Sequence, residues 1–382
     1  MKKVIYLDNA STTPLDKESA EKAINFCIEK YANPSSHSSL GEEVKKEIED
    51  ARKKIADFIN SEPEEIIFTS GATESINFAL KGLASAYPEK NQIITSEIEH
   101  PAVLETCRFL EKHGFKIEYI PVNKEGIVSI KDIKDKISEK TLVVSIMHVN
   151  NEIGTIQPIE EIAELCNKKN VFFHTDAVQS FAKLPIDIKK MKIDLMSVSG
   201  HKINAPKGIG FLYKRKGIKL EPLMHGGGQE KNLRSGTENV FGILSLAEVL
   251  KIKRNNEKIK LRRDYLIKEI LKIPGARLNG SLEKRIYSNI SVSFYGIEGE
   301  SIMMLLQDEG IIVSTGSACS SHKLQESHVL KAIKVPELYI NGSIRISLDV
   351  LSKQEADFVI EKFKSVVEKL RRISPFKFQE VK

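Results

Sequence analysis

Short apolar runs rich in β-branched residues alternate along this chain with amphipathic helical segments, and this alternation is what most restricts the fold. The helical segment 43–60, for example, places Val44, Ile48 and Ile55 on one face. Strand-like runs lie at 65–69, 92–95, 117–120, 142–147, 171–174 and 194–198, and each is followed by a polar turn. This order predicts an α/β domain around a mostly parallel sheet.

The pattern changes after about residue 255. Short strand-like runs at 276–279, 289–294, 311–313 and 343–348 are separated by helices, which is typical of a smaller α+β domain. The first residues also contain a short apolar run, which we expect to be a strand that packs with this second unit. We therefore predict a large domain over 15–255 and a small domain made of 1–14 with 256–382.

Composition narrows the class of protein. The chain has 382 residues and a net charge of +6, with basic residues concentrated in 251–263. Ile252, Ile259 and Leu266 recur there every seven residues, which predicts one long helix with a basic outer face. Such a face usually serves solubility, so direct nucleic-acid binding is not expected, although a platform that binds RNA stays an alternative.

No apolar run approaches the roughly 20 residues of a membrane helix, and the apolar stretch near the N-terminus is too short for a signal peptide. The four cysteines form no CxxC pair, so no intrinsic metal site is expected. We predict a cytoplasmic protein with free thiols.

Polar residues that could bind a ligand or take part in a reaction follow the predicted strands, and α/β sheets bind ligands at the carboxyl ends of their strands. Ser70-Gly71-Ala72-Thr73 opens a helix, so it is either an anion site or an ordinary turn. Asp176 follows the strand 171–174 and suits either a ligand cation, such as a pyridinium nitrogen, or a helix N-cap.

The string Ser199-Gly200-His201-Lys202 follows another apolar strand. An amine in a desolvated strand end is costly unless it is paired or made neutral, and a Schiff base is one such route. The alternative is an exposed loop lysine. Further along, 234–237 offers an arginine and hydroxyl groups that could hold a phosphate.

Cys319 lies among small polar residues, in Ser314–His322. A free cysteine is most often buried as a small apolar residue, but the surroundings of Cys319 contain no apolar partner and instead indicate a candidate nucleophile. Cys27, Cys107 and Cys166 each lie within helical apolar patterns and are predicted to be core residues.

Together these strings resemble the class V, fold-type I pyridoxal-phosphate enzymes, and specifically the cysteine desulfurases of the NifS/IscS kind. Ten strings match in the family's order and cover almost the whole chain: 6–13, 68–75, 99–100, 148–154, 174–179, 199–202, 226–230, 234–237, 316–319 and 343–345. The resemblance implies a seven-stranded-type sheet flanked by helices, a homodimer and pyridoxal 5'-phosphate as cofactor.

The resemblance also implies roles for individual residues. Lys202 would carry the cofactor as a Schiff base, and His100 would stack on its ring and shuttle protons as a catalytic residue. Asp176 would pair with the ring nitrogen and Gln179 with the ring hydroxyl. The phosphate would be held by Ala72, Thr73, Ser199 and His201, and by Thr237 across a dimer interface. Asn151 and Arg345 would hold the substrate carboxylate, with Asn151 also near the cofactor.

Cys319 would accept the sulfur of L-cysteine as a persulfide, releasing L-alanine, and could transiently ligate an iron–sulfur cluster. The sulfur would pass to an acceptor protein, either an iron–sulfur scaffold or a tRNA thiolase. A selenocysteine lyase or an aminotransferase on the same scaffold stays an alternative, although an aminotransferase would not need Cys319.

Overall fold

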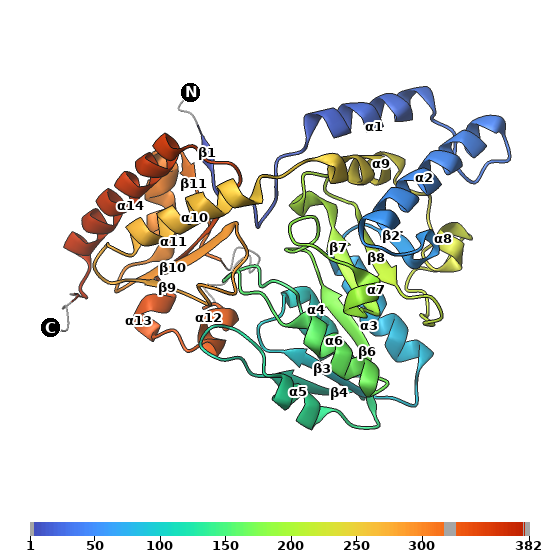
Figure 1. Cartoon of the computed structure of the whole chain (residues 1–382), viewed down its shortest axis with the longest axis horizontal. Helices are drawn as coiled ribbons and strands as arrows, with labels where there is room; N and C mark the ends of the chain where they lie inside the picture. The colour runs from blue at the N-terminus through green and yellow to red at the C-terminus, as the bar shows by residue number, and fades with distance from the viewer. Residues whose placement is uncertain (1–3, 317–325, 377, 379–382) are drawn as a thin grey trace.

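The computed structural model describes residues 4–316, 326–376 and 378. Its largest element is a seven-stranded sheet in the order β2-β8-β7-β6-β5-β3-β4 (Figure 1). In that order the strands are β2 (Ile66–Thr69), β8 (Gly210–Lys214), β7 (Leu195–Ser199), β6 (Phe172–Asp176), β5 (Thr141–Ser145), β3 (Gln92–Ser96) and β4 (Lys116–Ile120). The pairings of β4, β3, β5, β6 and β7 are parallel, whereas β8 runs antiparallel to both neighbours.

Helices cover both faces of this sheet, as the alternating pattern predicts. One core packs α3 and α4 against side chains such as Ile93, Leu142 and Leu212. The opposite core packs α2, α6 and α9 against Phe173, Phe211 and their neighbours. The helices of this part are α1 (Lys17–Glu29), α2 (Ser39–Phe58), α3 (Ala72–Ala86), α4 (Pro101–Glu111), α5 (Ile130–Lys136), α6 (Ile159–Lys168), α7 (Ile188–Met191), α8 (Gln229–Asn232) and α9 (Val240–Glu248), with 3-10 turns η1 (Pro63–Glu65), η2 (Gly200–Lys202) and η3 (Val249–Lys251).

A second layered unit is built on the three-stranded antiparallel sheet β12-β10-β9, next to the two-stranded parallel sheet β1-β11. The blue strand β1 lies beside the orange elements of the chain's other end (Figure 1). The elements are β1 (Ile5–Tyr6), α10 (Asn256–Ile270), β9 (Ala276–Leu278), β10 (Asn289–Phe294), α11 (Gly299–Asp308), β11 (Ile311–Ile312), α12 (His328–Ala332), α13 (Glu337–Ile340), β12 (Ser343–Ser347) and α14 (Lys353–Ile373). The expectation that the first strand packs with this unit is confirmed.

The structure adds one strand and corrects one expectation. Strand β8 was not predicted, because its sequence, Gly-Phe-Leu-Tyr-Lys, has only a short apolar run and its place in the sheet depends on the close contact of Gly210 with Gly71. The basic stretch 251–263 is not one helix: α10 begins at Asn256, capped by the side chain of Asn255, and Ile252 lies outside it. Within α10, Arg263 is buried and donates to the carbonyls of Arg285 and Ile286 instead of facing solvent.

A buried ion pair fixes the loop that precedes α9. Arg52 of α2 donates through both terminal nitrogens, each at 2.8 Å, to the carboxylate of Glu230, which also accepts from the backbone N–H of Phe68 at 2.9 Å. Glu230 and its two successors, Lys231 and Asn232, have positive φ angles of 45°, 57° and 65°. The buried pair therefore holds a strained turn in place.

Replacing Arg52 by Met is expected to lower the free energy of unfolding by about 3 kcal/mol, because it leaves the Glu230 carboxylate buried without its partner. Urea unfolding of both variants, with Lys53→Met as the control, measures the difference. Lys53 forms an exposed i,i+4 pair with Asp57, so its loss is expected to cost at most about 0.5 kcal/mol. Equal losses in the two variants would contradict a structural role for the buried pair.

Candidate active site

A cavity of about 450 Å³ lies at the carboxyl ends of β6 and β7, facing the N-terminus of α3. Its size is within the range of sites for cofactors and small ligands. It brings together ten residues that the sequence singled out: Ala72, Thr73, His100, Asn151, Asp176, Gln179, Ser199, His201, Lys202 and Arg345. Residues far apart in sequence therefore meet at the edge where parallel strands end.

One end of the cavity is built for an anion. The backbone at Gly71 has a φ of 150° and leads directly into α3, whose first residues are Ala72 and Thr73. A side chain at Gly210 would lie 2.7 Å from the Cα of Gly71, so only glycine lets β8 approach this turn so closely. The helix N-terminus thus offers N–H groups and positive dipole beside Ser199 and other polar side chains that line the cavity.

Lys207 also lines this end of the cavity and was not assigned a role from the sequence. It follows a proline in the turn before β8, and such a Pro-Lys-Gly turn next to a Gly-His-Lys string is the signal that could have revealed it.

His201 lies near Lys207, whose charge affects the protonation of the imidazole. Burial and the neighbouring charges of Lys202, Lys207 and Lys183 lower the pKa of His201 to about 4, so its ring is neutral at pH 7.

Asp176, the last residue of β6, also lines the cavity and is 5% exposed. Its carboxylate accepts from the backbone N–H of Val178 at 2.9 Å, so the N-cap-like contact and a ligand-facing position coexist. Burial raises the pKa of Asp176 to about 6, against the lowering effects of that hydrogen bond and of Lys202. A buried carboxylate in this state stabilises a cation placed beside it.

Lys202 ends the short turn after β7, and its side chain reaches the N-terminal segment. Its ammonium donates to the carbonyls of Ala10 at 2.7 Å and Ser11 at 2.5 Å. The same segment is held by Thr13, whose N–H and hydroxyl both donate to the carbonyl of His201. The reading of Lys202 as an ordinary exposed loop lysine is therefore wrong, because the residue lines a cavity and is half-buried.

His100 is the N-cap of α4, and its Nδ1 accepts from the backbone N–H of Ala102 at 3.1 Å. Because Nδ1 is an acceptor, the ring proton of the neutral form lies on Nε2. Burial, and next the charge of Lys202, lower the pKa of His100 to about 4, although Glu152 opposes this shift. His100 is therefore a neutral hydrogen-bond donor at pH 7 and a weak base.

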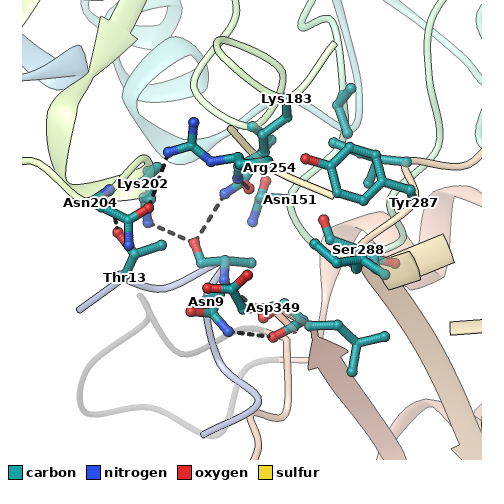
Figure 2. A pocket seen from close by; sticks show the side chains of 18 of the residues that line it. Asn9, Thr13, Asn151, Lys183, Lys202, Asn204, Arg254, Tyr287, Ser288 and Asp349 are labelled. Atoms are coloured by element: carbon teal, nitrogen blue, oxygen red, sulfur yellow. Dashed lines mark hydrogen bonds between the residues drawn. The ribbon is translucent and has the colours of Figure 1, made fainter. Parts of the chain in front are cut away.

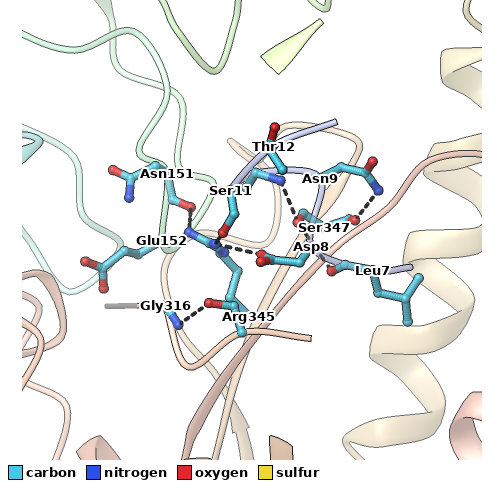
Figure 3. A network of polar contacts seen from close by, with 12 residues as sticks. Leu7, Asp8, Asn9, Ser11, Thr12, Asn151, Glu152, Gly316, Arg345 and Ser347 are labelled. Atoms are coloured by element: carbon cyan, nitrogen blue, oxygen red, sulfur yellow. Dashed lines mark hydrogen bonds and ion pairs between the residues drawn. The ribbon is translucent and has the colours of Figure 1, made fainter. Parts of the chain in front are cut away.

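Arg345 of β12 lies across the cavity mouth in a polar network (Figure 3). Its guanidinium pairs with Asp8 at 2.8 Å and donates to the hydroxyl of Ser11 at 2.7 Å and to the carbonyl of Asn151 at 3.1 Å. The pair with Asp8 orients the arginine and was not foreseen, although Asp8 lies in one of the matching strings. Such a held guanidinium suits a carboxylate ligand.

Two predicted residues are not among those that the structure places in this cavity. Thr237 is exposed in the loop before α9 and does not line the cavity of its own chain, so its role across a dimer interface stays a prediction. Cys319 lies outside the described residues. The chain on either side of that gap meets Glu152: Gly316 lies beside its carboxylate, and Ser327 donates to it at 2.5 Å.

The donor set fits pyridoxal phosphate, the group that the resemblance implies. An anion end, a buried carboxylate and an amine occur in one cavity, which match a phosphate, a ring nitrogen and an aldehyde. The part of the chain that the structure describes contains no cluster of side chains suited to a metal ion. It also contains no helix long and apolar enough to cross a membrane.

Comparison with known proteins agrees with this chemistry. The aminotransferase class-V family model matches residues 5–357. Cysteine desulfurase IscS of Dictyoglomus turgidum is 48% identical over 99% of this chain and 98% of its own length. A solved NifS-like protein superposes with a TM-score of 0.91 at 40% identity, covering 96% of this chain and 100% of that one. The structure of SspA in complex with cysteine has a TM-score of 0.83 at 37% identity, covering 92% and 100%.

Asp176→Asn is expected to stabilise the cofactor-free protein above pH 6. The pKa of Asp176 is raised from 3.8 to about 6 in the fold, so its favourable contribution is complete below pH 3.8 and is lost as the pH rises through about 6. That difference of about 2 pH units corresponds to about 3 kcal/mol at pH 8.

Thermal unfolding of the cofactor-free protein at pH 8 and pH 4 measures this effect. The stabilisation is expected at pH 8 and is expected to vanish at pH 4, whereas Asp50→Asn, an exposed change on α2, is expected to be neutral at both. A stability gain that is the same at both pH values would rule out relief of a buried carboxylate.

Proposed function

This chain belongs to the aminotransferase class-V family, within its cysteine desulfurase group, and we propose that it holds pyridoxal phosphate on Lys202 and transfers the sulfur of L-cysteine through Cys319. The observation that carries the cofactor proposal is the meeting of Asp176, Lys202 and the N-terminus of α3 in one cavity. We also propose that the large unit, 15–255, holds the cofactor and that 256–382 with 1–14 forms the small unit.

The cofactor would be held at three points. The N–H groups of Ala72 and Thr73, with Ser199 and His201, suit the phosphate; Thr237 of a second copy would add a hydroxyl in the proposed homodimer. Asp176 would hold the ring nitrogen in its protonated form, and Gln179 would donate to the ring hydroxyl. Pyridoxal phosphate, when bound, withdraws electrons from the substrate Cα and so makes its proton removable.

The residues of this chain would then bind and orient L-cysteine. The carboxylate fits between Arg345 and Asn151, which line the same cavity and are joined by a hydrogen bond. Lys202, which lines the same cavity, would take the Cα proton on its Nζ. His100 is neutral and carries its proton on Nε2, so we assign it to donation and ring contact and not to proton abstraction.

Cys319 would complete the transfer. Its thiolate attacks the sulfur of the substrate, so that an S–S bond forms while the Cβ–S bond of the substrate breaks. The electron pair of that bond goes to the substrate carbon, which takes up a proton. L-cysteine and the Cys319 thiol thus become L-alanine and a Cys319 persulfide, with no other oxidant or reductant required.

We propose that the persulfide passes to an acceptor protein in the cytoplasm. The name IscS of the relatives favours a scaffold for iron–sulfur assembly. Transfer to a tRNA thiolase is the second possibility, and the described residues offer no separate support for it. A basic platform for RNA is not favoured, because cations of α10 are paired locally, as Lys260 and Arg263 are with Asp264.

Lys202→Ala is expected to abolish covalent attachment of the cofactor, because Lys202 is the lysine that follows β7 at the carboxyl end of the sheet, where Asp176 also lies. Borohydride reduction followed by intact-protein mass measurement is expected to fix one cofactor on the wild type and on Lys190→Ala, whose lysine is exposed on α7. A Lys202→Ala protein that still gained the cofactor mass at this site would refute the assignment.

Cys319→Ala is expected to lower the release of L-alanine from L-cysteine by about 100-fold or more, because the sulfur acceptor is lost. The reaction is followed by measuring alanine and sulfide together, with Cys27→Ala as the matched control, since Cys27 is a half-buried thiol of α1. If Cys319→Ala kept full cysteine turnover, the desulfurase mechanism through this residue would be wrong.

A further inference from the structure

Gln179 lines both the active-site cavity and a second cavity next to it. Figure 2 shows the second cavity, with Lys183, Lys202 and Asn151 among the residues that line it. The second cavity lies where the two units meet, because it is lined both by residues of the loops after β6 and β7 and by Tyr287, Ser288 and Asp349 from the other unit. Lys202 and Asn151 also line both cavities. A group in the second cavity can therefore act on the first through Gln179.

The amide of Gln179 has its two ends in different contacts. Its Nε2 donates to the carbonyl of Ala10 at 3.0 Å, and its Oε1 accepts from the ammonium of Lys183 at 3.3 Å. Since Nε2 carries two hydrogens, the bond to Ala10 leaves one for a ligand. An ammonium has no acceptor, so rotation of the amide by 180° would place an NH₂ group against Lys183 and an oxygen against the Ala10 carbonyl.

Lys183 is half-buried, and its surroundings give it few other contacts. Within the described part of the chain it forms no ion pair within 4 Å, and Gln179 is its hydrogen-bond partner. Burial, and then the charges of Lys202 and Arg254, lower the pKa of Lys183 to about 7, while Asp349 opposes this. The phenol of Tyr287 also lines the cavity and has its pKa raised to about 12 by burial, so it stays neutral.

We propose that Lys183 is a positioning residue: in its protonated form it fixes the Gln179 amide with its nitrogen toward the ring hydroxyl of pyridoxal phosphate and extends positive charge toward that oxygen. This inference rests on the proposed function, because it requires the cofactor in the adjacent cavity. Lys183 touches neither the cofactor nor the substrate cavity; it acts through Gln179.

The consequence is a measurable property of the bound cofactor. A nearby positive charge and a fixed donor both favour the deprotonated form of the cofactor chromophore, so their removal favours the protonated form. The midpoint of the pH titration of the visible absorption band therefore reports on Lys183 in the resting protein without L-cysteine. A purely structural role for Lys183 would change stability and leave this midpoint in place.

The experiment titrates the visible band of the cofactor-loaded wild type, Lys183→Met, Lys183→Arg and Lys190→Met. We expect the midpoint of Lys183→Met to rise by about one pH unit. A shift of this size corresponds to the free energy of one charged hydrogen bond, which here acts on the cofactor through Gln179. Lys183→Arg keeps donor and charge and is expected to restore the wild-type midpoint. Lys190→Met, a change at an exposed lysine of α7, is expected to leave it unchanged.

If Lys183→Met does not accumulate as folded protein, Lys183→Gln replaces it, because it removes the charge and keeps a polar side chain of similar reach. A midpoint equal to that of the wild type in the charge-removed variant overturns the inference while leaving the proposed function intact. A wild type that shows no visible band after incubation with pyridoxal phosphate overturns the proposed function itself.

Discussion

Hydrogen bonds to the backbone carbonyl of Ala10 join the two halves of the site. Lys202 and Gln179 both donate to this oxygen from the loops of the large sheet. The same segment is also bonded to β12 of the small unit. The side chain of Asn9 donates to the Ser347 carbonyl, and the N–H of Ala10 donates to the Ser347 hydroxyl. The cavity wall depends on this one segment being bonded on both sides.

The cavity carries charges of both signs. Lys202, Lys207 and the positive end of α3 line it together with the buried carboxylate of Asp176, and Lys183 lies in the second cavity behind Gln179. Desolvation raises the pKa of Asp176 to about 6 and lowers that of His100 to about 4, so at pH 7 the cavity holds a carboxylate that is costly to keep ionised and an imidazole that stays neutral. This is the electrostatic state of a site prepared for a group with both an anionic and a cationic end.

Much of the fold and site could be predicted from the sequence, because the spacing of apolar residues and the polar turns between elements are local features of the sequence. Because Asp176 and Lys202 each follow a predicted parallel strand, the sequence alone places both at the carboxyl edge of the large sheet. The antiparallel strand β8 and the start of α10 could not be read, since each depends on a tertiary contact: close packing of Gly210 on Gly71, and capping by Asn255. Likewise, Asp8 and Arg345 are 337 residues apart in the sequence, and no local sequence pattern predicts that they form a pair.

The pairing of β1 with β11 has a consequence for how the protein is made. Ile5 leaves the ribosome before its partner Ile311, which follows about 300 residues later. Until then strand β1 has no sheet to join, and closing so long a loop carries an entropic cost before any contact rewards it. During synthesis the large sheet can therefore form before the segment next to β1 is bonded from both sides. The proposed cofactor site is complete only once β11 and Ser347 of β12 have been made.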